Sequence, residues 1–261
     1  MSKNLEGNVA AGGEGDQLFA EGKVMSLFEH LNELRYRLII SLVAIILLFC
    51  VNMFFANDIL LFLKKPLEEV LPGARSTLHF TGPLDVFLVG MKVAFLTAII
   101  AASPVWLTQF WKFIEPALYK RERTFIMPFI VASVLLFLLG VSFCFYIILP
   151  LTLKFLIGMG QEVGTAIITI TDYISLLVVL IFGFGIVFEA PLVLVMLALL
   201  GVVDAEQLSK ARRHVVVGIL VVAALLTPPD PLSQVGMSIP LYVMFEISII
   251  IIRLLKRKKP S

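Results

Sequence analysis

A single carboxylate interrupts a long uncharged apolar stretch of this sequence. Glu189 lies near the middle of the segment 174–200, which contains no other Asp, Glu, Lys or Arg. Ionised groups are expensive in hydrocarbon, so such residues usually face a bundle interior or a wet cavity and mark function. Pro191 follows two residues later and frees backbone carbonyls that neighbouring helices or water must satisfy. We interpret Glu189 as a functional intramembrane group; the alternative is a protonated, hydrogen-bonded glutamic acid with a packing role.

A second carboxylate lies in a basic loop. Glu122 follows Lys120 and Arg121 and precedes Arg123. Pro116 ends the helix before this loop, because proline lacks an amide donor and restricts the residue that precedes it. The spacing favours a locally compensated surface charge. The alternative is a carboxylate held ready for an incoming cation.

Charged residues near the N-terminus belong to a predicted amphipathic helix. Ser26 and Glu29 have the spacing of a capping box, in which each side chain satisfies an amide at the helix start. Leucines recur at three- and four-residue spacing along one side, at positions 27, 31, 34 and 38. Glu33, Arg35 and Arg37 occupy other faces. The pattern alone indicates an interfacial anchor with solvated charges that leads directly into the first membrane span.

Polar residues flank the turn between the last two apolar segments. Thr227 ends one segment, and Asp230 and Gln234 flank the start of the next. Polar side chains hydrogen-bond across membrane helices at ~1 kcal/mol each. One interpretation is therefore a patch that accepts a partner helix, and the other is a set of interface residues at a turn. Further along, Glu246 is expected to reach toward Arg253.

The elements that must position these residues are membrane helices. Hydrophobic residues make up 59% of the 261 and charged residues 15%, with a mean hydropathy of +1.00. Soluble domains are about half apolar and a quarter charged, whereas a hydrocarbon core ~30 Å thick needs about 20 apolar residues as helix. The sequence predicts an all-α polytopic membrane protein with six spans, at residues 38–55, 86–111, 124–149, 174–200, 215–226 and 235–252.

The fifth of these segments is short. It forms only about 18 Å of helix at ~1.5 Å per residue, a length that is also typical of a re-entrant hairpin. A hairpin would place Asp230 in hydrocarbon at ~3 kcal/mol, whereas a short span thins the bilayer at fractions of a kcal/mol per Å. We therefore expect two short full spans at the end of the chain.

Basic residues predict the orientation of these spans. Of the 21 Lys and Arg, sixteen lie before the first span, between spans two and three, between spans four and five, or after span six. The positive-inside rule places those segments in the cytoplasm, so both termini are expected to be cytoplasmic. Residues 1–24 are predicted to be a disordered extension, residues 25–253 the six-helix domain, and residues 254–261 a basic cytoplasmic tail.

Enzyme chemistry finds little support in this sequence. The three histidines lack metal-ligand spacing, and neither a P-loop nor a nucleophile elbow is found. No catalytic activity, metal, cofactor or nucleic-acid partner is expected. The two halves also lack paired interrupted apolar segments, the usual sign of an inverted-repeat transporter. Apolar residues around Pro66 recur at roughly helical spacing and predict surface helices that form an external lid.

Several segments together resemble the TatC family, the large polytopic subunit of the twin-arginine protein translocase. The resemblance extends from Met25 to about Arg253 and is carried by HLNELRYRL (30–38), FAND (55–58), ASP (102–104), FIEPALYKRER (113–123), FEAP (188–191) and LTPPD (226–230). It implies six helices in a concave, glove-like wall with a short fifth and sixth helix, in the bacterial cytoplasmic (inner) membrane. It also implies an oligomeric complex with single-span TatA- and TatB-type subunits, driven by the proton gradient without ATP.

The resemblance further implies a peptide-binding site. Glu33 and Glu122 would be the carboxylates that bind the paired arginines of signal peptides on folded precursors. Arg35, Phe113 and Arg123 would shape the same site. A planar guanidinium offers a carboxylate a two-point fork that lysine cannot reproduce.

Other roles follow from the same resemblance. Glu189 would line the concave face, and Thr227, Asp230 and Gln234 would lie near the docking site for partner subunits. Pro66 would belong to an external loop that supports translocation. We therefore expect a receptor subunit for twin-arginine signal peptides. The rival hypothesis is a small secondary transporter with Glu189 as its proton or ion site.

Overall fold

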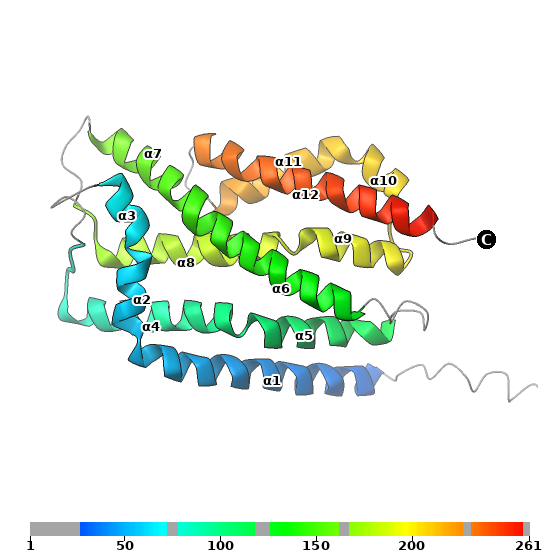
Figure 1. Cartoon of the computed structure of the whole chain (residues 1–261), viewed down its shortest axis with the longest axis horizontal. Coiled ribbons are helices and arrows are strands. Elements are labelled where there is room, and N and C mark those ends of the chain that lie inside the picture. The colour runs from blue at the N-terminus through cyan, green and yellow to red at the C-terminus, as the bar shows by residue number, and fades with distance from the viewer. Residues whose placement is uncertain (1–26, 72–77, 118–125, 162–166, 227–230, 258–261) are drawn as a thin grey trace, which may run out of the picture.

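The computed structural model describes residues 27–71, 78–117, 126–161, 167–226 and 231–257. Within these ranges the chain is helical apart from short connections and one isolated bridge between His79 and Thr169. The long helices run side by side (Figure 1). Helix α1 begins and helix α12 ends at one end of the bundle, which we call the terminal end, while α2 and α3 lie at the opposite, capped end.

Helix α1 (Leu27–Phe54) is one unbroken helix of 28 residues. The predicted amphipathic start therefore continues directly into the first span, as expected. Helix α1 packs against α4 and α5 and lies at the edge of the bundle (Figure 1). None of its residues from 28 to 54 is buried within the chain.

Two short helices form the capped end. Helix α2 (Ala56–Leu63) packs on α4, and α3 (Lys65–Val70) packs on α7. Pro66 lies in the first turn of α3 and is buried beside the fully buried Leu67. The Tyr173 hydroxyl donates a hydrogen bond to the Leu63 carbonyl between these helices. The predicted helices around Pro66 are therefore present, and they pack against α4 and α7 of the bundle.

Two of the predicted spans are interrupted. The second consists of α4 (Pro83–Ala101) and α5 (Ser103–Ile114), followed by a 3₁₀ turn (Glu115–Ala117). The fourth consists of α8 (Ile170–Val187) and α9 (Ala190–Leu199). In α5 and α9 a proline lies in the first turn. Proline has no amide donor and crowds the preceding turn, so a helix restarts there more readily than it continues.

The third predicted span is longer than expected. Helix α6 (Ile126–Phe143) leads through a π-helical turn (Cys144–Ile148) into α7 (Leu149–Gln161), so the helix continues well past residue 149. The Leu149 amide bonds to the Cys144 carbonyl in the wide π pattern. This turn directly precedes Pro150, which has no amide to donate.

The last helices correct the expectation of two short spans. Helix α10 (Ala205–Lys210) leads into α11 (Arg212–Leu226), whose 15 residues form about 22 Å of helix. Helix α12 (Pro231–Arg257) has 27 residues and is long. The predicted sixth span, 235–252, stopped where polar and basic residues begin. Such residues end an apolar segment, but the helix itself continues through them. Within the described part of the chain, five segments are long and apolar enough to cross a membrane: Phe28–Phe54, Pro83–Ala101, Ile126–Met159, Ile170–Leu199 and Gln234–Leu255.

Candidate functional site

Glu33 already binds a guanidinium, that of Arg37 one turn further along α1. Arg37 Nε donates to Glu33 Oε1 at 2.9 Å, and Arg37 Nη2 donates to the same oxygen. Only about a fifth of each side chain is exposed. A glutamate placed four residues before an arginine is the favourable orientation for such a pair on a helix.

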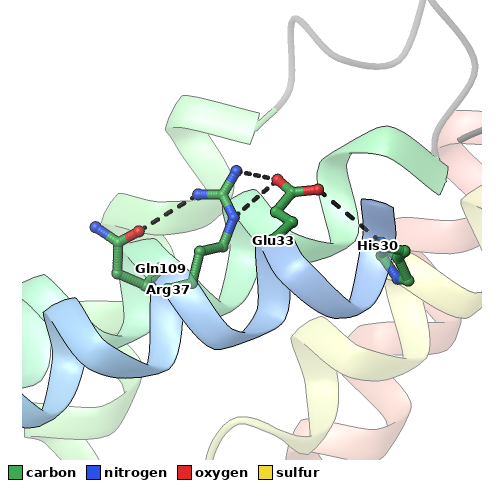
Figure 2. Close-up of polar contacts among 4 residues, drawn as sticks. All are labelled: His30, Glu33, Arg37 and Gln109. Carbon is green, nitrogen blue, oxygen red and sulfur yellow. Dashed lines mark hydrogen bonds and ion pairs between the residues drawn. The ribbon is translucent and has the colours of Figure 1, made fainter. Parts of the chain in front are cut away.

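The same guanidinium joins α1 to α5. Arg37 Nη1 donates to Gln109 Oε1 at 3.3 Å, and Gln109 lies in the middle of α5. One turn further on, the rings of His30 and Phe113 stack with centroids 4.3 Å apart and planes 13° from parallel. Figure 2 shows Gln109, Arg37, Glu33 and His30 in a row along this seam between the two helices.

The second oxygen of Glu33 is enclosed. Oε2 is buried and accepts no hydrogen bond from any of the residues that the structure describes. His30 Nδ1 lies 3.9 Å from this oxygen. Both hydrogen bonds that Arg37 donates to Glu33 go to Oε1. Oε2 lies between the guanidinium and the His30–Phe113 stack.

The structure brings together some of the predicted peptide-binding residues. Glu33 and Phe113 both contact His30. Arg35 is two residues from Glu33, about 200° around the helix, and lines a shallow hollow with residues 28, 29, 31 and 32. Glu122 and Arg123 lie outside the described residues.

Glu189 lies at the break between α8 and α9 and is buried. The Ser133 hydroxyl of α6 donates to Glu189 Oε2 at 2.6 Å. Glu189 Oε1 is buried and has no hydrogen-bond partner among the described residues. The carboxyl group thus faces the bundle interior. The hydrogen bond from Ser133 agrees with a packing role for Glu189. A packing role does not account for the buried Oε1, which accepts no hydrogen bond from the described residues.

Of the three residues predicted to lie near a partner-binding patch, only Gln234 is described; Thr227 and Asp230 are not. Gln234 Nε2 donates to the Leu220 carbonyl at 3.1 Å, which ties the start of α12 to α11. An apolar groove of about 300 Å³ lies further along these two helices, where α8 and α9 approach them. Pro191, Val215, Gly218 and Met244 are among the residues that line it.

Sequence reasoning missed several polar contacts. Lys92 lies in the middle of α4 and donates to Ser175 of α8 at 3.0 Å. Glu246 contacts Arg212: Arg212 Nε lies 2.7 Å from its Oε1, and Arg212 Nη2 donates to its Oε2 at 2.8 Å. The Glu-to-Arg spacing of four was a visible signal for Glu33 and Arg37. The contacts between distant helices had no such local signal.

Comparison with known proteins gives one consistent family. A sequence model described as "Sec-independent protein translocase protein (TatC)" matches residues 29–240. The chain is 43% identical over 238 residues to the Sec-independent protein translocase protein TatC of Aquifex aeolicus (strain VF5), covering 90% of this chain and 98% of that relative. It is 40% identical over 223 residues to TatC of Escherichia coli (strain K12), covering 85% of this chain and 86% of the relative.

Solved structures agree with the sequence comparison. The fold matches one named "Crystal Structure of Twin Arginine Translocase Receptor- TatC" with a TM-score of 0.74 at 40% identity, covering 87% of this chain and 99% of the other. It matches a second, named as the same receptor in DDM, with a TM-score of 0.76 at 41% identity, covering 85% of this chain and 99% of the other.

Proposed function

The chain belongs to the TatC family of Sec-independent protein translocase proteins, and we propose that it is the subunit that binds twin-arginine signal peptides. As a member of that family it is a membrane component of twin-arginine protein transport and works in a complex with other Tat subunits. The finer proposal is that the signal peptides of folded precursors dock at the terminal end of the bundle, on Glu33.

The observation that carries this proposal is the Glu33 carboxylate holding a guanidinium. Arg37 donates to it through two nitrogens, the kind of contact that an arginine side chain of a peptide would offer. Arginine presents a planar fork of donors that lysine does not have. A pair of such contacts would distinguish twin arginine from twin lysine. We propose Glu122 as the second carboxylate, with Phe113 and Arg123 beside the same site and Arg35 contributing from the opposite face of α1.

Two further observations support the membrane orientation that we propose. Helix α1 begins and α12 ends at the terminal end (Figure 1), which requires an even number of crossings. Five segments are long enough to cross, so we propose that the short α11 provides the sixth crossing. Among the described residues, basic side chains lie near helix ends: Lys112 in the last turn of α5, Lys210 in the last turn of α10, Arg213 at the start of α11 and Arg253 near the end of α12. These helix ends lie at the terminal end (Figure 1). By the positive-inside rule this end is cytoplasmic in the bacterial inner membrane.

We further propose roles for the remaining groups. Glu189 lines the concave side of a glove-like wall, and the neighbourhood of Gln234, with Thr227 and Asp230, accepts single-span TatA- or TatB-type subunits. Pro66 supports translocation from the capped end. The complex uses the proton gradient. These roles are supported by the positions of the residues at helix breaks and helix ends. Backbone and side-chain polar groups are available there to hydrogen-bond to another membrane helix.

A second candidate function rests on the buried, unpaired Oε1 of Glu189. A secondary transporter would use this carboxyl group as a proton or ion site. Reconstituted alone in vesicles, such a transporter takes up solute. The receptor does not, because its cargo requires the other subunits.

Crosslinking of the purified chain to a signal peptide tests the receptor function. A peptide bearing Arg-Arg is expected to crosslink strongly and its Lys-Lys counterpart weakly. Glu33→Ala and Glu122→Ala are each expected to reduce crosslinking, and the double variant to abolish it. Glu206→Ala is the matched control, since its exposed carboxylate on α10 pairs only with exposed Lys210 among the described residues. Equal crosslinking of both peptides, or full retention in the double variant, contradicts the proposal.

A further inference from the structure

We propose that Arg37 is an internal occupant of the Glu33 site, which the arginine of an incoming signal peptide must displace. Arg37 would then set how tightly the receptor binds. The inference rests on the proposed function, because it concerns the same carboxylate. It assigns a role to a residue that the sequence pattern indicated only as a solvated charge.

The first reason is that Glu33 has no free oxygen edge. Arg37 Nε and Nη2 both donate to Oε1. Oε2 is buried, with His30 Nδ1 at 3.9 Å. A second guanidinium therefore finds one oxygen engaged and the other enclosed, and it must take the place of an existing neighbour.

The second reason is that Arg37 can leave Oε1 without losing all of its partners. Its Nη1 already donates to Gln109 Oε1 on α5, at 3.3 Å. His30, by contrast, is held by its stacking on Phe113. Arg37 is also the group that an arriving arginine repels, since like charges at close range destabilise one another. Displacement of Arg37 toward Gln109 is thus the smallest rearrangement that opens the carboxylate.

The consequence for binding is quantitative. When only a fraction of the protein is in the open state, the apparent dissociation constant equals the intrinsic constant divided by that fraction. The factor applies equally to an Arg-Arg and a Lys-Lys peptide. Arg37 therefore raises the dissociation constants of both peptides and leaves their ratio, which reflects the carboxylate itself, unchanged.

The contrasting interpretation is an ordinary helix pair. A glutamate and an arginine four residues apart stabilise a helix modestly, and the link to Gln109 would then simply hold α1 in position. In that case removal of Arg37 loosens the site and weakens peptide binding. The two interpretations predict opposite signs for the same measurement.

Dissociation constants of labelled Arg-Arg and Lys-Lys signal peptides, measured on the purified full chain, decide between them. Arg37→Ala is expected to tighten both by the same factor, roughly three- to tenfold for a partly buried charged pair. Arg37→Lys, which keeps the charge and the helix, is expected to tighten both by less. Arg213→Ala removes an exposed charge from α11 and is expected to change neither constant.

A double-mutant cycle separates displacement from a general charge effect. In a Glu33→Gln background, Arg37→Ala is expected to give no further tightening, because no carboxylate remains to be occupied. Unchanged or weaker binding in Arg37→Ala and Arg37→Lys overturns the inference, as does equal tightening in both backgrounds. Failure of the unmodified chain to prefer the Arg-Arg peptide would instead refute the proposed receptor function.

Discussion

Ser133 and Glu189 share a hydrogen bond of 2.6 Å between α6 and the break that precedes α9. Both residues are buried. The bond places the carboxyl group of Glu189 against α6 at the point where the fourth span loses its regular helical pattern. The polar group and the helix break therefore form one structural unit.

Removal of the Ser133 hydroxyl is expected to destabilise the fold. Ser133→Ala leaves Glu189 Oε2 without its described donor, and an unsatisfied buried polar group costs about 1–3 kcal/mol. Thermal unfolding in detergent should show a lower midpoint. Ser142→Ala, on an exposed site of the same helix, is the control and should have little effect. In a Glu189→Leu background the loss caused by Ser133→Ala should shrink; an equal loss there would show that the bond is unimportant.

Close helix packing at Gly140 is expected to tolerate no side chain. A Cβ at this position would lie 2.8 Å from the Phe184 carbonyl oxygen and 2.8 Å from Phe188 Cβ. Small residues allow membrane helices to approach in this way, so Gly140→Ala should separate α6 from α8 and lower both the unfolding midpoint and export.

Two other glycines provide graded comparisons for that variant. At Gly185 the three atoms nearest to the new Cβ all belong to the buried Phe137 ring, at 2.6 to 3.1 Å; a side-chain ring can yield more than the Phe184 backbone does, so a smaller loss is expected. At Gly218 nothing lies within 4 Å, and Gly218→Ala should be neutral or stabilising by up to about 1 kcal/mol through helix propensity. A loss at Gly218 as large as at Gly140 would refute the packing explanation.

The Arg212–Glu246 pair is expected to hold the short α11 against α12. Both guanidinium contacts are at or below 2.8 Å, and Tyr242 donates to the same carboxylate at 3.0 Å. A double-mutant cycle on unfolding should give a coupling free energy of about 0.5–1 kcal/mol. Lys210 and Glu206, whose side chains are more than three-quarters exposed, should give a coupling near zero. Equal couplings would contradict this role.

Lys92 is expected to lower stability and to be needed for export. It lies in the middle of α4 with Ser175 as its described partner. A lysine at the centre of a membrane helix costs about 3 kcal/mol by insertion scales. Lys92→Leu should therefore raise the unfolding midpoint while reducing export, and Lys92→Arg should preserve export. Full export by the Lys92→Leu variant would show that export does not need the lysine.

The bilayer around α11 is expected to be thin. Its 15 residues form about 22 Å of helix, against a hydrocarbon core of ~30 Å. In reconstituted membranes, lipid order measured near the protein should report local thinning, and export should be greater in short-chain lipids than in long-chain lipids. A bilayer of uniform thickness around the protein would refute the prediction that α11 by itself crosses the membrane.

The sequence predicted the helical class, and each of the five apolar helices long enough to cross a membrane among the described residues overlaps a predicted span, because apolar length is a local property. Helix continuity was harder to infer. Pro104 and Pro191 lie inside apolar runs, and composition alone does not show whether a proline bends a helix or restarts it. Helix α12 was underestimated because charged residues end an apolar segment without ending a helix.

Within the candidate site, the sequence identified Glu33 and Phe113 only through a family resemblance. The periodicity suggested solvated charges on α1. The contact of Arg37 with Gln109 joins residues 72 positions apart, and such a pair depends on how α1 packs against α5. Local spacing contains no information about that packing.

The exposed position of α1 has a mechanical consequence. Polar and aromatic contacts position it against α4 and α5, among them His30 with Phe113, Phe49 with Phe95, Arg37 with Gln109, and Asn52 with Thr97. Half-buried residues along α1 pack on α4 and α5, so these neighbours contact the helix along one side while its other side is exposed. A change in the Arg37 contact therefore acts on a stiff rod about 42 Å long, whose opposite end leads directly into α2 and the cap.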